Sequence, residues 1–274
     1  METVYRFAWY FFLYAFLGWC CEVCFAAAKD GKFVNRGFLN GPVCPIYGFG
    51  VVVVVGLLAP VRENVFLLFL CSVILTSALE WITGFVLEKA FHQKWWDYAE
   101  MPFNLNGYVC LLFSLLWGLA CLLIMDVIHP MVASLVGHIP HTLGLVLLGV
   151  FTALILADLG ATVATIAKLN RRLRQIDELA AKIHELSDSL GENLAEATLT
   201  LTEKGEALKG DLEERRAALE EKKAALEARR SELLSHRPFG QGRLLKAFPH
   251  MKSTRHGAAL EQLKERLRRA KKEN

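Results

Sequence analysis

The sequence predicts an all-α integral membrane protein with about five transmembrane helices, followed by a charged helical tail in the cytoplasm. Three observations support this fold class. Of the 274 residues, 54% are hydrophobic, and the net charge is only +3. Residues 1–167 contain 7 Lys and Arg and 10 Asp and Glu, whereas residues 168–235 contain 13 and 15. The apolar part is also divided into segments of membrane-spanning length, so we expect a membrane domain followed by a hydrophilic tail.

The membrane-spanning segments can be counted from their length. The hydrocarbon core of a bilayer, about 30 Å thick, requires about 20 mostly apolar residues in a helix. The start METVYR is barely basic, and Glu22 interrupts the first segment, so we interpret that segment as a retained span rather than a cleaved signal peptide. The five expected spans are residues 5–28, 43–61, 64–88, 107–128 and 142–167.

The orientation follows from the Lys and Arg residues in the short loops. Nine of them lie in residues 29–42, 89–106 and 168–174, while only Arg6 and Arg62 lie on the other side. Positive loops are normally cytoplasmic. We therefore expect a multi-pass protein of the plasma or inner membrane, with its N-terminus outside and its C-terminus in the cytoplasm.

The first four helices show an internal repeat. Shifting the sequence by 66 residues aligns residues 17–44 with residues 83–110 and gives eight identities, including Leu-Asn-Gly at 39–41 and at 105–107. Each unit would be a helix running inward, a cytoplasmic loop and a helix running outward. Helices one to four are therefore a candidate parallel two-hairpin repeat.

The two Leu-Asn-Gly turns allow two interpretations. In the first, Asn40 and Asn106 are N-caps that start the second and fourth helices, with Pro42 or Pro45 in the first turn. In the second, two helix N-termini facing the cytoplasm provide free amides for an anion or a substrate.

Ionisable residues inside the predicted spans are candidates for function because burying a charge in a bilayer is costly. Glu80 is the strongest candidate, since no cation lies one turn away on its own helix. Glu22 and Glu88 lie closer to the inner ends of their helices. For these two, pairing with Arg36, Lys89 or Lys94 is the alternative to a role in transport.

Two long stretches carry a resemblance to a known family. They are FVNRGFLNGPVCPIYGFG at 33–50 and EKAFHQKWWDYAEMPFNLNG at 88–107. With these motifs the chain resembles a bacterial membrane family described as putative ABC-transporter type IV, or CmpB-like permeases. The resemblance implies a permease component whose ATPase is a separate subunit. One departure is Tyr108, where the family tends to have a basic residue.

These arguments together predict a polar, cytoplasm-facing substrate site. No Walker A or GxSxG pattern occurs, so we do not expect an enzyme, and we expect no catalytic residues, no metal site and no cofactor. The candidate substrate-contacting residues are Glu22, Arg36, Asn40, Glu80, Glu88, Asp97, Asn104 and Asn106.

The tail has two parts. Residues 168–235 show two heptad registers with a narrow apolar stripe, which favours a long helix or a weak coiled coil that could self-associate or bind a protein. Residues 236–274 are basic, with a break at HRPFGQG and a short helix at 258–272. We expect this end to contact lipid headgroups or protein rather than nucleic acid. The alternative function is therefore a non-transporting scaffold that recruits partners through the tail.

Overall fold

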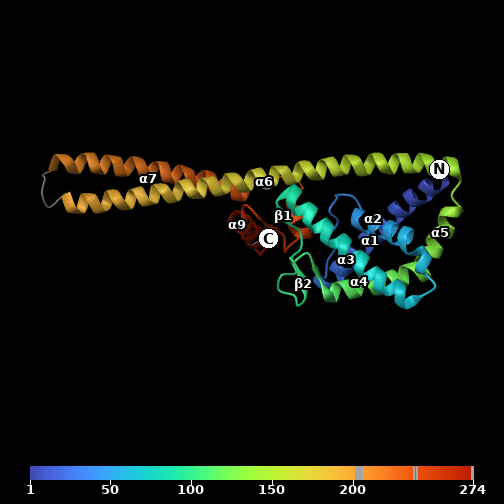
Figure 1. Cartoon of the computed structure of the whole chain (residues 1–274). Helices are drawn as coiled ribbons and strands as arrows, with labels where there is room; N and C mark the ends of the chain where they lie inside the picture. Colours follow the sequence, from blue (N-terminus) through green and yellow to red (C-terminus); the bar gives the residue numbers. More distant parts are fainter. Residues whose placement is uncertain (201–205, 237, 239, 273–274) are drawn as a thin grey trace. The chain divides into compact units, whose positions relative to one another are not determined.

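The computed structural model describes residues 1–200, 206–236, 238 and 240–272 (Figure 1). The chain forms two compact units. Unit 1 comprises Met1–Ile166 together with Phe239–Thr254, and unit 2 comprises Ala167–Pro238 together with Arg255–Asn274. The chain therefore returns to unit 1 after leaving it, a feature that the sequence had not suggested.

Unit 1 contains four helices that are long and apolar enough to cross a membrane. They are α1 (Glu2–Asp30), α3 (Val65–Phe91), the continuous helix Leu111–Gly137, and the first part of α6 (His141–Thr200). The protein is thus almost entirely α-helical and has the composition of a membrane protein, as the sequence predicts. The remaining apolar helix, α2 (Pro45–Leu58), has 14 residues and ends in a 3-10 turn at Ala59–Val61. The count of five spans stays a prediction.

The helix Leu111–Gly137 runs further than the sequence indicates. It comprises α4 (Leu111–Leu123), a π-helical segment at Ile124–Ile128 and α5 (His129–Gly137). The expected spans 107–128 and 142–167 leave residues 129–141 as a loop, and this expectation is wrong for residues 129–137. Pro130 supplies a physical reason for the π-helical segment, because its ring would clash with the carbonyl of Asp126 in a regular α-helix.

The helices pack as two hairpins, α1 against α2 and α3 against α4, with α2 also packed against α3. Most of the buried core lies between α1, α2 and the helix Leu111–Gly137. Its largest aromatic members come from α1, which explains why that helix is rich in Trp, Tyr and Phe. The most deeply buried core residues are Tyr14, Val54, Leu68, Met125 and Val136.

The two Leu-Asn-Gly turns do not cap helices. α2 begins at Pro45 with Cys44 as its N-cap, and α4 begins at Leu111 with Cys110 as its N-cap. The N-cap interpretation of Asn40 and Asn106 is therefore wrong. Pro45 does occupy the first helical position, where its missing N–H costs no hydrogen bond.

The second of these turns belongs to a small β-hairpin between α3 and α4. Its strands are β2 (Asn104–Leu105) and β3 (Val109–Cys110), paired antiparallel. The Tyr108 N–H donates to the Leu105 carbonyl at 3.1 Å, and the two central residues, Asn106 and Gly107, have φ of 57° and 73°. Two positive φ angles define a type I′ turn, for which Asn-Gly is the preferred pair.

The part of unit 1 that lies near the C-terminus consists of α8 (Gln241–Ala247) and β4 (Lys252–Ser253). β4 pairs antiparallel with β1 (Gln93–Lys94), which follows α3, and the register places Gln93 opposite Ser253. We refer to residues 240–254 as the clip.

Unit 2 contains the later part of α6, α7 (Glu206–Ser235) and α9 (Gly257–Lys272). Figure 1 shows α7 returning alongside α6, and at one end the Arg172 guanidinium donates to the carbonyls of Leu233 and His236. Two contacts fix α9. His256, directly before the helix, lies 2.7 Å from Asp177 on α6, and Arg230 on α7 donates a hydrogen bond to Gln262 within the helix. The short basic helix expected at 258–272 is thus present, while a coiled coil stays a prediction.

Candidate functional site

Glu22, near the end of α1, has two partners from other parts of its hairpin. The Tyr47 hydroxyl on α2 donates to Glu22 Oε1 at 2.6 Å, and Arg36 Nε lies 3.0 Å from Glu22 Oε2. The predicted pairing of Glu22 with Arg36 is therefore present. The charge of the Glu22 carboxylate is thus balanced by Arg36, which lies in the loop that follows α1.

Glu88, near the end of α3, has the same set of partners. The Tyr108 hydroxyl donates to Glu88 Oε2 at 2.7 Å, and Lys94 Nζ lies 4.0 Å from the same oxygen. Burial and the neighbouring Glu88 carboxylate raise the pKa of Tyr108 to about 12, so its hydroxyl remains a hydrogen-bond donor at neutral pH. Lys89, the other predicted partner, lies over the Phe85 ring instead.

A glycine four residues before each glutamate makes these contacts possible. Gly18 lies against the ring of Tyr47, and Gly84 lies against the ring of Tyr108, so that neither position has room for a Cβ atom. The pairs Gly18–Glu22 and Gly84–Glu88 are equivalent in the 66-residue repeat, whereas the two tyrosines are not. The two hairpins therefore reach the same arrangement of glycine, carboxylate, tyrosine and cation from different tyrosine positions.

Glu80 differs from Glu22 and Glu88 because no cation among the described residues accompanies it. The Tyr98 hydroxyl lies 3.5 Å from Glu80 Oε1, at the limit of a hydrogen bond. Glu80 Oε2 is buried and has no hydrogen-bond partner in the part of the chain that the structure describes. The pKa of Tyr98 is raised, mainly by burial of the side chain and next by the neighbouring Glu80 carboxylate.

The first Leu-Asn-Gly turn is bound by Asp158 on α6. Asp158 Oδ1 accepts from the backbone N–H and the side-chain amide of Asn40, at 3.1 and 2.7 Å, and Oδ2 accepts from the Gly41 N–H at 2.7 Å. In the sequence, Asp158 interrupts the fifth expected span, but nothing near it indicates a role. The turn uses free amides to hold an anion, but the anion is a side chain of the same protein. The amides also precede the start of α2 at Pro45, so they are not the helix N-terminus of the second interpretation.

In the second turn, two of the candidate site residues hold the loop together. The Asn104 side-chain amide donates to the carbonyls of Ala99 and Met101, and Asn104 Oδ1 accepts from the Gly107 N–H. Asn106 is exposed, and its carbonyl accepts from Lys94 Nζ at 3.2 Å. Nothing in the structure tests their predicted contact with a substrate.

Asp97 lies in the same loop, where a residue of the clip binds it. Asp97 Oδ2 lies 2.7 Å from Lys252 Nζ, and its Oδ1 accepts from the Ala99 N–H at 3.1 Å. Partial burial raises the pKa of Asp97, but the hydrogen bonds from Lys252 and Ala99 outweigh burial, so the pKa lies below its ordinary value.

The loops of the two hairpins meet through aromatic rings. The Phe38 ring centroid lies 5.1 Å from that of Trp95 and 5.9 Å from that of Phe91. We refer to residues 37–41 and 92–97 as the loop face. The candidate residues thus belong to two hairpins that touch at one end of unit 1.

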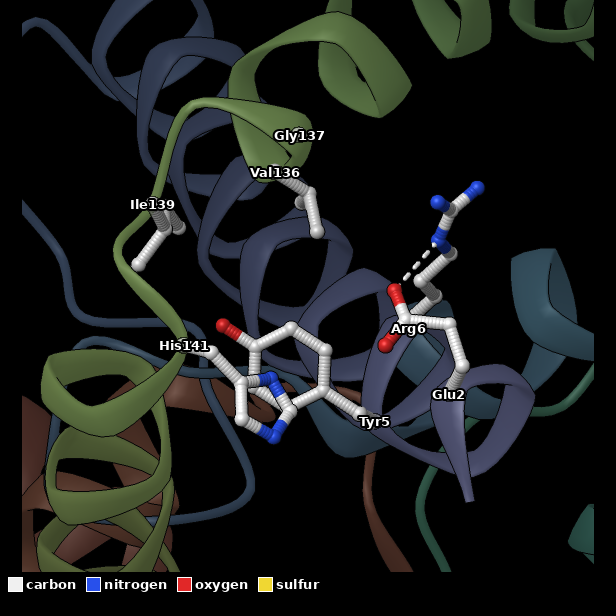
Figure 2. A pocket seen from close by; sticks show the side chains of 7 residues that line it. All are labelled: Glu2, Tyr5, Arg6, Val136, Gly137, Ile139 and His141. Carbon is white, nitrogen blue, oxygen red and sulfur yellow. Dashed lines mark hydrogen bonds and ion pairs between the residues drawn. The ribbon is translucent and has the colours of Figure 1, made fainter.

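A cavity of about 330 Å³ lies at the opposite end of α1, a 29-residue helix about 43 Å long (Figure 2). Figure 2 shows the Tyr5 and His141 rings side by side, with the Glu2–Arg6 pair on another wall. None of the predicted site residues lines this cavity. Its lining residues are Glu2, Tyr5, Arg6, Val136, Gly137, Ile139 and His141.

Long apolar helices with carboxylates near their ends, joined by ordered polar loops, define a polytopic helical membrane protein. The chain belongs to the family described as putative ABC-transporter type IV, whose model matches residues 9–163. This match confirms the resemblance seen in the sequence. It includes the loop face and Asp158, and it ends before unit 2 and the clip. No solved structure matches the chain.

Proposed function

We propose that the chain is the permease component of an ABC-type transporter, with its substrate site at the loop end of unit 1. The family membership supports this proposal, as do the polar residues that both hairpins direct to that end. The excess of Lys and Arg in the loops supports a cytoplasmic position for the loop end. On this proposal a separate subunit hydrolyses ATP, and the chain itself is not an enzyme.

The observation that carries the proposal is the state of Glu80. Glu22 and Glu88 are each satisfied by a tyrosine and a cation. Glu80 has one long contact and one buried oxygen for which the described residues provide no partner. A buried carboxyl oxygen without a hydrogen-bond partner costs about 1–3 kcal/mol, so a structure that retains one is expected to use it. A group that donates hydrogen bonds or carries positive charge is the natural ligand of Glu80.

The test is flux through the full chain in proteoliposomes, with and without candidate ATPase subunits, for a panel of organic and inorganic cations. Glu80→Gln should reduce uptake at least tenfold. Asp126→Asn is the matched control, since Asp126 is an exposed carboxylate paired with Arg62 in another part of unit 1. If both variants behave like the wild type, Glu80 has no part in transport. If the wild type moves no solute, the permease proposal fails.

The scaffold function also has an observation in its favour. Unit 2 is a separate compact unit, and it lies outside the family match. Deleting the whole tail would not separate the two functions, because the clip would be lost as well. Shortening α6 and α7 by equal lengths near residues 201–205 leaves the clip in place. If the chain is a permease, this variant should keep its flux. If the chain is a scaffold that binds partners along these helices, the variant should no longer bind them.

A further inference from the structure

The clip binds the loop face across a large separation in sequence. The Arg243 guanidinium donates to the Gly37 and Phe38 carbonyls at 2.7 and 3.0 Å, over a separation of about 205 residues. Lys252 Nζ binds Asp97 at 2.7 Å, over a separation of 155 residues. Each cation therefore holds a different hairpin's loop.

An apolar anchor lies between these two polar contacts. The Phe248 ring centroid lies 4.9 Å from that of Trp95, with the rings nearly perpendicular. Leu244, Ala247 and Met251 are at most 1% exposed. Burial of aromatic and aliphatic side chains is the main source of affinity in most peptide complexes, and this anchor occupies the centre of the clip.

Backbone pairing completes the contact. β4 adds to β1, and the Thr254 N–H and hydroxyl both donate to the His92 carbonyl at 3.1 Å. His92 ends α3 with φ of 55°, and this left-handed residue turns its carbonyl away from the helix. Strand addition with side-chain anchors is a common mode of peptide recognition.

We propose that the loop face is a peptide-docking surface and that the clip is its ligand, supplied by the same chain and able to be displaced. The peptide class it recognises has an arginine in a short helix, an aromatic residue five positions later, just after the helix, and a lysine four positions after that in a two-residue strand. In the structure, the ligand bound to the loop face is therefore the clip of the same chain.

The extent of the family match supports this interpretation. Gly37, Trp95 and Asp97 lie within the matched residues 9–163, whereas every residue of the clip lies outside them. The docking surface therefore belongs to the part of the chain that defines the family, and its ligand does not.

The nature of the contacts supports displacement. β1 and β4 are two residues each, and Lys94 lies opposite Lys252 in the ladder, so two like charges face each other near Asp97. The Lys252 side chain is 60% exposed. The chain on both sides of the clip belongs to unit 2, so a change in unit 2 has a covalent route to the clip.

A bound clip fixes the loops of both hairpins to one another. Under the proposed permease function, these loops would have to move apart during transport, and the clip would act as a brake. That consequence rests on the proposed function, whereas the docking surface does not.

The test uses the full chain in detergent and a fluorescently labelled synthetic peptide with the sequence of residues 240–254. The variant Arg243→Ala/Phe248→Ala should release the clip and bind the labelled peptide at least tenfold more tightly than the wild type does. The difference arises because a tethered competitor has an effective concentration of the order of millimolar. A peptide carrying the same two substitutions is the ligand control. Arg216→Ala, which affects an exposed pair within α7, is the protein control.

Hydrogen exchange at residues 92–97 reports whether the clip has left. Faster exchange in the double variant, reversed by adding the peptide, supports the proposal. Unchanged exchange in a folded variant overturns it, as does faster exchange without peptide binding.

If the double variant does not fold, the same measurement on the wild type tests the proposal. Millimolar peptide should then accelerate exchange at residues 251–254, and its failure to do so overturns the proposal. A concentration-dependent doubling of mass would show that the clip of one copy docks on the loop face of another. That result supports the docking surface, with a second copy of the chain supplying the ligand.

Discussion

At the scale of single residues, the polar groups of the loop end differ mainly in how completely they are satisfied. Asp158 accepts three hydrogen bonds from one turn, and Glu22 and Glu88 are each bound by a tyrosine and a cation. Glu80 has one buried oxygen that no described residue contacts by a hydrogen bond. A satisfied carboxylate fixes structure, whereas an unsatisfied one is available to a ligand.

Asp158→Asn should loosen the first Leu-Asn-Gly turn. The substitution replaces a charged acceptor with a neutral amide, and hydrogen bonds to charged groups contribute about 1.5–3 kcal/mol. Hydrogen exchange at the Asn40 and Gly41 amides should accelerate by about 10- to 150-fold. Asp126→Asn should leave these two amides unchanged. Equal protection of the amides in the wild type and in Asp158→Asn would contradict the assigned role.

The pKa of Asp97 predicts an acid-sensitive clip. The pKa of Asp97 is lower in the folded protein than in the unfolded chain. The Asp97–Lys252 contact therefore makes its full contribution to the stability of the docked clip at pH values above the ordinary pKa of an aspartate, about 3.9. Its contribution is lost as the pH falls through the depressed value. Hydrogen exchange at residues 251–254 should therefore rise below about pH 4 in the wild type, after correction for the intrinsic pH dependence of exchange. Asp97→Asn should show the faster exchange already at neutral pH and no further acid step.

At the scale of elements, much of the fold was predictable because hydropathy reports directly on helices that cross a bilayer. The repeat correctly aligned Gly18 with Gly84 and Glu22 with Glu88, and charge pairing correctly indicated Arg36 and Lys94 as partners. The Asn-Gly pair at 106–107 is a standard signal for a hairpin. Its similarity to the first copy, which precedes a proline, favours a helix start instead.

The glycines of the two hairpins give a prediction at this scale. Gly18→Ala and Gly84→Ala should each destabilise the protein by about 1–3 kcal/mol, because the added methyl group would overlap the ring of Tyr47 or Tyr108. Gly50→Ala on α2 is the control, since no neighbouring side chain lies within 4 Å of the place that its Cβ atom would take. Thermal unfolding in detergent measures all three. A loss at Gly50 equal to that at Gly18 would contradict the packing argument.

At the scale of the whole molecule, the contacts missed from the sequence are those that join distant segments. Nothing near Arg243 indicates that its partners are the carbonyls of Gly37 and Phe38, because backbone carbonyls carry no signal in a sequence. Asp158 gives no signal for the same reason, since two of its hydrogen bonds come from backbone amides 118 and 117 residues away. Helix positions and local charge pairs depend on nearby residues, whereas docking of the clip depends on tertiary structure.

Transport should respond to the clip if both proposals hold. Arg243→Ala/Phe248→Ala should raise the rate of flux severalfold in proteoliposomes, since the loops would no longer be joined. Combining it with Glu80→Gln should return the flux to the level of Glu80→Gln alone. A double variant with lower flux than the wild type would show that the clip supports transport rather than restrains it.

The path of the chain between the two units also constrains its biosynthesis. Asp97 is translated 155 residues before Lys252, and at roughly 5–20 residues per second this separation takes about 8–30 s. During that interval the membrane helices are made and the loop face has no clip. The newly made protein therefore passes through a state in which Trp95 and the edge of β1 are accessible to chaperones, proteases or another copy of the chain, and synthesis of residues 240–254 ends this exposure.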